Sequence, residues 1–340
     1  MKVPSSHVES LMRLGYTEAE ARFLYVVATH SGYFTLRQYL QFIEAHRGKR
    51  SSVFAKKVLE SGHASVRDYL GYGGVYHVFS RTLYGPIDKA NLRNRRQHSF
   101  EFIRTRLVLL DFLIAHPDFD YLESEQEKVA LFCEKLGVAQ EFLPAKVYEG
   151  GLGSRPTVRY FVDKFPLFLA PSVPSFPPVV TLSYVDSGAG SMVGFETHLA
   201  AYQPLLQQLR SFRFLYISPS NGLFARATER FRKTVKTPLE SDVSSEILRY
   251  FQIRKRFEER RYVVPVTADF EFLNEARRRF HGERFEGLYA SWQSGAIGEP
   301  ELRREFSQIK PGSSVFFETV LVAQHRSTLA STERKRVNVA

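Results

Sequence analysis

This sequence contains only one cysteine, and it lacks long apolar runs and a secretion signal. Its single cysteine, Cys133, cannot form an internal disulfide, and no apolar run approaches the roughly 20 residues that a membrane-spanning helix needs. The N-terminal residues also lack the apolar segment of a signal peptide. We therefore expect a cytoplasmic protein, associated with the nucleoid or a plasmid, that has no membrane partner.

The sequence motifs of several enzyme classes are also missing. The 340 residues contain no P-loop, no GxGxxG and no His/Cys cluster with metal-ligand spacing. The ten histidines are scattered, which argues against a paired-histidine metal site of the relaxase type. We therefore expect no cofactor and no metal, and we do not expect an enzyme.

Positive charge is abundant and unevenly placed. The chain has a formal net charge of +11. Residues 1–100 hold 15 Lys and Arg against 7 Asp and Glu, a net +8, so the other 240 residues carry only +3. Positive charge concentrated in one region is typical of a nucleic-acid-binding surface. The plain alternative is a basic face that only aids solubility.

Residues 49–80 combine a short basic helix with two β-prone segments, 66–70 and 75–79, joined at Gly73-Gly74. Two helices are expected before them. Thr17 and Glu20 form a capping-box pattern ahead of the first, and Thr35 caps the second, which we expect to end at Gly48. Three helices followed by a hairpin predict a winged helix-turn-helix domain.

The third helix has the composition of a recognition helix. We expect Ser51 or Ser52 to cap it, and Phe54 and Val58 to face the core because they are four residues apart. Ser51, Ser52, Ala55 and Lys56 would then point outward. Small polar and basic groups of this kind read base edges and bind phosphates.

The residues predicted to contact DNA fall into three groups. Ser51, Ser52 and Lys56 would reach the major groove. Tyr72 and His77 would contact DNA near the tip of the hairpin, although such tyrosines more often pack against the protein core. The residues expected to bind phosphate are Lys49, Arg50, Lys57, Arg81, Arg95 and Arg96.

The rest of the chain predicts a connector and a second domain. A long, unusually apolar helix over 98–115 is expected to pack against either the second domain or its own copy in a homodimer. Alternating strands and helices after residue 150 predict an α/β layer with parallel strands. We expect a domain over 1–90, a connector over 91–149, an α/β domain over 150–330 and a basic tail over 331–340.

Three acidic residues of the second domain suggest an alternative function. Asp163 on one expected strand, Asp186 at the end of another and Glu196 on the next helix could hold Mg²⁺ in a nuclease. The strand that ends at Asp186 lacks the Glu-x-Lys pair that such nucleases carry. The simpler interpretation is that Asp186 caps a turn and that Asp163 lies on the surface.

A family resemblance rests on the second domain. Val185-Asp186, then Tyr202, then Ile217-Ser218-Pro219-Ser220 resemble motifs of the replication-relaxation family, plasmid and mobile-element proteins also grouped with mobilisation accessory proteins. Members begin with a winged helix-turn-helix. The resemblance implies a C-terminal domain similar to a degenerate restriction-endonuclease-like core, because this chain has Tyr184 where the family tends to carry an acid.

Together the residues and the resemblance predict a function. We expect a protein that binds double-stranded DNA sequence-specifically and acts in transfer, replication or transcriptional control of a plasmid or mobile element. The expected partners are duplex DNA, a second copy of the chain, and mobilisation or replication proteins. The alternatives are the Mg²⁺-dependent nuclease and a winged helix that binds another protein instead of DNA.

Overall fold

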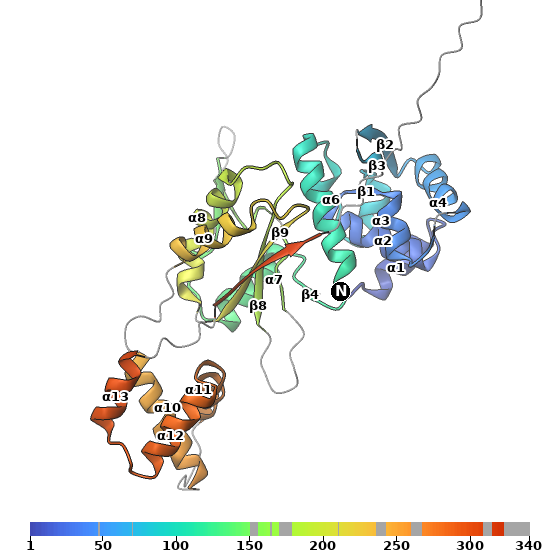
Figure 1. Cartoon of the computed structure of the whole chain (residues 1–340). Coiled ribbons are helices and arrows are strands. Elements are labelled where there is room, and N and C mark those ends of the chain that lie inside the picture. The colour runs from blue at the N-terminus through green and yellow to red at the C-terminus, as the bar shows by residue number, and fades with distance from the viewer. Residues whose placement is uncertain are drawn as a thin grey trace, which may run out of the picture.

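The computed structural model combines helices with several separate β-sheets (Figure 1). It describes residues 1–46, 48–69, 71–149, 156–163, 165–169, 179–209, 211–235, 243–259, 267–308 and 315–322. The described chain forms an N-terminal unit around one sheet, a larger sheet covered by helices, and a separate bundle of helices. The expected basic tail, 331–340, lies outside the described residues.

The N-terminal unit packs helices against one face of an antiparallel sheet. Its elements, in chain order, are α1 (Ser5–Met12), α2 (Glu18–Val26), a π-helical turn η1 (Val27–Ser31), β1 (Tyr33–Thr35), α3 (Leu36–Phe42), α4 (Lys49–Glu60), β2 (Ala64–Tyr69) and β3 (Gly73–Val78). The strands are ordered β1-β3-β2. Both predicted caps are confirmed, because Thr17 and Thr35 each form a complete capping box.

Three local predictions in this unit were wrong. Helix α3 ends at Phe42 and not at Gly48, and Glu44 then takes a positive φ of 50°. Helix α4 has Gly48 as its N-cap, and no side chain caps it. Gly73 and Gly74 do not form the turn of the hairpin, because they already belong to β3 and pair with Tyr69 and Asp68.

Helix α6 (Phe100–Ala115) joins this unit to the large sheet. Before it come α5 (Arg81–Tyr84) and the 3₁₀ turns η2 (Gly85–Ile87) and η3 (Arg93–Arg95). One side of α6 packs on η1, β1 and α3, and the other contacts β8 (Val180–Val185) and β9 (Phe212–Ser218). The helix is apolar on nearly all sides because both sides are buried, as expected for packing against the second domain.

The large sheet has the order β10-β9-β8-β7-β4, which adds β4 (Asp120–Tyr121), β7 (Phe168–Leu169) and β10 (Val315–Leu321). Strands β8, β9 and β10 run parallel, which confirms the predicted pairing. Helices α8 (Val193–Gln208) and α9 (Phe224–Thr234) cover one face and α6 the other (Figure 1). Side chains of β9 alternate accordingly: Phe214 and Tyr216 face α8 and α9, whereas Leu215 and Ile217 face α6.

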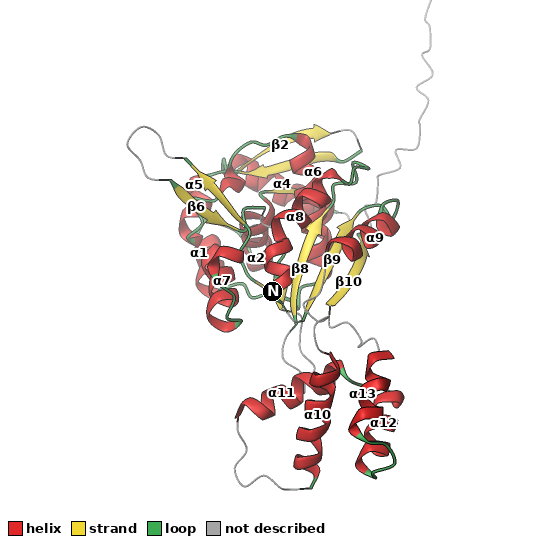
Figure 2. Cartoon of the chain, turned by 90° about the vertical axis from the view of Figure 1, so that its left-hand side faces the viewer, coloured by secondary structure: helices red, strands yellow, loops and turns green. Residues whose placement is uncertain are grey.

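A small hairpin and a helical bundle complete the described chain. Helix α7 (Glu125–Ala130), a π-helical turn η4 (Leu131–Lys135) and a 3₁₀ turn η5 (Gln140–Phe142) lead to the hairpin of β5 (Ala145–Tyr148) and β6 (Thr157–Tyr160). The bundle has its own core and lies beyond one end of the large sheet (Figure 2). It contains α10 (Val243–Glu258), α11 (Thr267–Arg279), α12 (Glu283–Gln293) and α13 (Glu299–Gln308). Within the described ranges, no helix has the length and apolar character that crossing a membrane requires.

Candidate nucleic-acid interface

Helix α4 presents a polar stripe to solvent. Phe54 and Val58 are fully buried, as predicted, and this fixes which side of the helix faces outward. Lys49, Ser52, Val53 and Lys56, at spacings of three and four residues, form the outward stripe. The Lys56 side chain is 73% exposed, with Glu60 as a distant partner at 3.7 Å. The centre of this stripe is therefore free to meet a large ligand.

Two residues of α4 differ from the prediction. Ala55 is buried and not exposed, because it lies next to Phe54 on the core side. Val53 is 56% exposed at the centre of the stripe, and the sequence interpretation missed it. Its exposure could have been predicted from the sequence, because Val53 lies four residues after Lys49 and so on the same side of the helix. An exposed valine is a suitable group to contact a thymine methyl.

The start of α4 carries further exposed cations. Lys49 and Arg50 are exposed, and neither forms an ion pair within the described part of the chain. Ser51 is half-buried, and its hydroxyl donates to the Gly48 carbonyl, while Ser52 donates to Lys49. Both serines thus use their hydroxyls to stabilise the first turn, although neither is the N-cap.

Lys57 does not have the role predicted for it. Its Nζ lies 2.6 Å from Oε2 of buried Glu20 and 5.6 Å from the centre of the Tyr16 ring. Glu20 is also the residue that closes the capping box of α2. Lys57 therefore joins α4 to α2, and it is not available to bind phosphate.

The hairpin residues predicted to contact DNA are also engaged inside the protein. His77 is buried, stacks on Tyr33 at 4.4 Å and lies 3.0 Å from the Asn94 carbonyl. Burial lowers the pKa of His77, so the ring is neutral at physiological pH. Tyr72 is half-buried against Phe100, and its hydroxyl accepts a hydrogen bond from Arg104. The predicted DNA contacts of these two residues are therefore not supported.

The three arginines outside α4 and the hairpin that were predicted to bind phosphate have different surroundings. Arg95 donates to the carbonyls of Phe79 and Ala90, at 2.9 and 2.6 Å, so it stabilises the loop instead of facing a ligand. Arg81 and Arg96 are exposed. Of the predicted phosphate-binding residues, the ones that remain accessible are Lys49, Arg50, Arg81 and Arg96.

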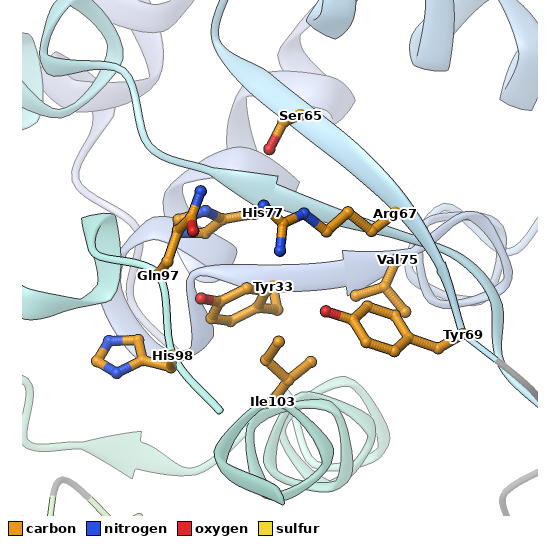
Figure 3. A pocket seen from close by; sticks show the side chains of 9 residues that line it. All are labelled: Tyr33, Ser65, Arg67, Tyr69, Val75, His77, Gln97, His98 and Ile103. Atoms are coloured by element: carbon orange, nitrogen blue, oxygen red, sulfur yellow. The ribbon is translucent and has the colours of Figure 1, made fainter. Parts of the chain in front are cut away.

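A small polar pocket lies between the sheet of the N-terminal unit and the start of α6 (Figure 3). Its volume is about 20 Å³, which is room for a water molecule. It is lined by aromatic, basic and amide side chains: Tyr33, Ser65, Arg67, Tyr69, Val75, His77, Gln97, His98 and Ile103. Figure 3 shows the Arg67 guanidinium reaching across it towards His77 and Gln97.

Asp163 lies in the turn between β6 and β7, and not on a strand. Its carboxylate is 3.1 Å from Nδ1 of buried His198, and its carbonyl accepts a hydrogen bond from buried Arg106. Burial acts to raise the pKa of Asp163, but the bond to His198 and the charge of Lys128 hold it below its usual value. This carboxylate therefore neutralises buried cations, which corrects its interpretation as a simple surface residue.

Asp186 and Glu196 have partners of their own. Asp186 is buried at the end of β8, and Ser218 donates to its Oδ2 at 2.9 Å. Glu196 pairs with Arg230 of α9 at 3.2 Å. In the portion of the chain that the structure describes, no three His, Cys, Asp or Glu side chains gather as a metal site would require. The proposed nuclease set thus gains no support from the geometry.

Comparison of the chain with protein-family models, with curated proteins and with solved structures finds no significant match.

Proposed function

We propose that this protein binds double-stranded DNA sequence-specifically through the exposed stripe of α4. The observation that carries the proposal is the stripe itself: two lysines, a serine and a valine on a short helix whose opposite side is locked into the core. An α-helix fits the roughly 12 Å wide major groove of B-DNA. Lysines at its edge would meet phosphates, and Ser52 and Val53 would meet base edges.

The order of elements supports this proposal. Helix, strand, two helices and two strands, with β1 paired to β3, is the arrangement expected of a winged helix-turn-helix. In that arrangement α3 and α4 form the helix-turn-helix, α4 reads the groove, and β2 and β3 form the wing. Lys49, Arg50 and Lys56 supply the phosphate contacts, and Arg81 and Arg96 are further exposed cations.

The biological setting is part of the same proposal. It follows the resemblance to the replication-relaxation family: a plasmid or mobile element, in transfer, replication or transcriptional control, with a second copy of the chain and mobilisation or replication proteins as partners. On the same resemblance, we propose that the large sheet belongs to a degenerate restriction-endonuclease-like core. The alternative that α4 binds a protein is less favoured, because exposed lysines are depleted at the centre of protein interfaces.

Salt-dependent binding to a duplex tests the proposal. Each lost phosphate contact should reduce the slope of log affinity against log salt by about 0.9. Replacing Lys49 and Lys56 together by alanine should therefore reduce the slope by about 1.8 and weaken binding about 30-fold near 0.15 M salt. The measurement is fluorescence anisotropy with a labelled duplex library.

The matched control is Lys233→Ala on α9. Lys233 is 68% exposed and pairs with a glutamate four residues away, as Lys56 does. The Lys233→Ala variant should bind the duplex as tightly as the wild type does. Ser52→Ala should instead change which sequences are preferred. The proposal fails if the wild-type protein does not bind duplex even at low salt, or if the Lys233 variant loses as much affinity as the double variant.

A further inference from the structure

A second exposed surface lies on the other face of the same sheet. Strand β2 alternates, so Val66 and Asp68 lie on the side of the α4 core and Arg67 and Tyr69 on the side of α6. His98 lines the pocket beside Arg67, and Phe100 at the start of α6 stacks on Tyr69. His98 in turn contacts Arg93 of η3, which contacts Tyr148 of the β5–β6 hairpin. We call the following group the aromatic–arginine surface: Arg67, Tyr69, Arg93, His98, Phe100 and Tyr148.

The aromatic rings of this surface are stacked and yet accessible. Phe100 stacks on Tyr69 with 4.6 Å between ring centres and an interplanar angle of 10°, and Phe100 remains 38% exposed. His98, which is half-buried, stacks on Phe102 at 4.1 Å. Aromatic rings usually bury their large apolar area in a core or an interface. Ring faces and edges held at the surface point to a ligand that stacks.

Cations lie among these rings. The Arg93 guanidinium is 4.9 Å from the centre of the Tyr148 ring and donates to its hydroxyl at 3.2 Å. Lys146 approaches the same ring, at 5.5 Å. Among the described residues, Arg67, Arg93 and Lys146 make no ion pair with an acid. Their charges are therefore available to an anionic ligand.

The acidic residues nearby form no ion pair with these cations among the described residues. Asp68 lies on the opposite face of β2, where its charge adds to burial in raising the pKa of Tyr76. Glu101 and Glu149, both exposed, follow Phe100 and Tyr148 in the chain. The charge of Glu101 acts on Tyr184, which belongs to the large sheet.

Hydrogen bonds connect the residues of this surface to the loop that carries Arg93 and Arg96. His98 lies 3.1 Å from the Arg93 carbonyl, and the Tyr33 hydroxyl donates to the carbonyl of exposed Arg96 at 3.0 Å. Tyr33 and His98 also line the pocket beside Arg67 (Figure 3). Its Gln97, Ser65 and tyrosine hydroxyl groups can donate to or accept from a water molecule in the pocket, which can bridge to a bound ligand.

We propose that the aromatic–arginine surface binds a single-stranded polynucleotide. Bases of a single strand expose the faces that a duplex hides, and they stack on aromatic side chains while cations follow the phosphates. The surface supplies both kinds of group, and beside them lies a polar pocket with room for a water molecule. Because it lies on the opposite face of the sheet from the α4 core, this binding does not depend on the duplex-binding proposal.

The test measures binding of the full chain to a labelled 20-nucleotide oligothymidine and, in a parallel arm, to oligouridine. Phe100→Leu keeps the apolar bulk but removes the ring, and it should weaken binding about tenfold. Phe270→Leu is the matched control, because Phe270 on α11 is 40% exposed and also contacts another ring. It should have no effect. The two arms show whether the strand bound is DNA or RNA.

A second variant guards against a folding defect. Arg93→Gln changes an exposed side chain, and it should reduce the salt slope of single-strand binding by about 0.7. Arg22→Gln, exposed on α2 and paired with Glu18, is its control. The proposal is overturned if neither oligonucleotide binds, or if both bind and Phe100→Leu and Arg93→Gln bind them like the wild type. The Lys49 and Lys56 variant should retain single-strand binding, so failure of one proposal is distinguishable from failure of the other.

Discussion

Gly32, between η1 and β1, lies at the point where the N-terminal unit meets the loop that carries the arginines. Its φ is +80°, a conformation that favours glycine. Its carbonyl accepts a hydrogen bond from the Val78 amide at 2.9 Å. A Cβ added here would lie 2.6 Å from the Asn94 carbonyl oxygen and 3.0 Å from Asn94 Cβ. Gly32→Ala should therefore be costly.

Two separate effects contribute to the cost. The left-handed conformation alone costs an alanine about 1–2 kcal/mol. The contact with the Asn94 carbonyl is with backbone, which cannot rotate away, and overpacking of this kind costs about 1–3 kcal/mol. Asn94 is also held by its own side chain, which donates to the carbonyls of Ala28 and Thr29, both at 3.1 Å. We expect a total loss of about 2–5 kcal/mol in the free energy of unfolding of this unit.

Gly15→Ala separates the two effects. Gly15 also has a positive φ, of +93°, but nothing lies within 4 Å of the position of an added Cβ. This variant should lose only the conformational part, about 1–2 kcal/mol. The difference between the two variants, about 1–3 kcal/mol, measures the close approach of Gly32 to the loop.

Urea unfolding followed by far-UV circular dichroism measures both variants. Trp292 is the single tryptophan of the chain and lies in α12 of the separate bundle, so its fluorescence gives an internal reference. The tryptophan transition should keep its midpoint, while the N-terminal transition moves to lower urea. Equal losses for Gly32→Ala and Gly15→Ala, within about 0.5 kcal/mol, would contradict the proposed contact with Asn94.

Two further predictions concern pH and catalysis. Burial lowers the pKa values of His63 and His77 below the usual 6.5, so the unfolded chain binds protons more readily, and the free energy of unfolding should fall as the pH drops below about 6.5. His77→Phe keeps the stacking on Tyr33 but should make that decline shallower, as pH-dependent urea midpoints would show. Supercoiled plasmid incubated with Mg²⁺ or Mn²⁺ should stay intact, because Asp163, Asp186 and Glu196 each have a separate partner. Metal-dependent nicking that Asp186→Ala abolishes would instead favour the nuclease alternative.

Local signals in the sequence were sufficient for much of the fold. The capping boxes at Thr17 and Thr35 depend on residues three apart, so the sequence displays them directly. The burial of Phe54 and Val58 follows from helical spacing. The parallel strands β8 and β9 are rich in apolar and β-branched residues and are buried along nearly their whole length, as parallel strands are. These features need no knowledge of distant partners.

The misassigned site residues share a different origin. Lys57 pairs with Glu20, 37 positions away, and Asp163 pairs with His198 on another element. From the sequence alone, a charged residue with an ion-pair partner cannot be told from neighbouring cations that have none. Only the tertiary structure shows which residue has a partner. The aromatic–arginine surface was missed for the same reason, although the alternation of Arg67 and Tyr69 along β2 placed both on one face.

Helix α6 determines how the two proposed binding surfaces relate to each other. Its apolar character left two possibilities open, packing against the second domain or against a second copy. In the structure, α6 contacts β8 and β9 of the large sheet, and Leu110 lies in a core that also contains Val185 and Ile217. The apolar residues of α6 thus give no separate reason to expect a dimer, and a second copy would have to use another surface. Since β1 packs on α6 as well, the sheet that separates α4 from the aromatic–arginine surface is held against the rest of the molecule, and the two surfaces should act at a fixed separation.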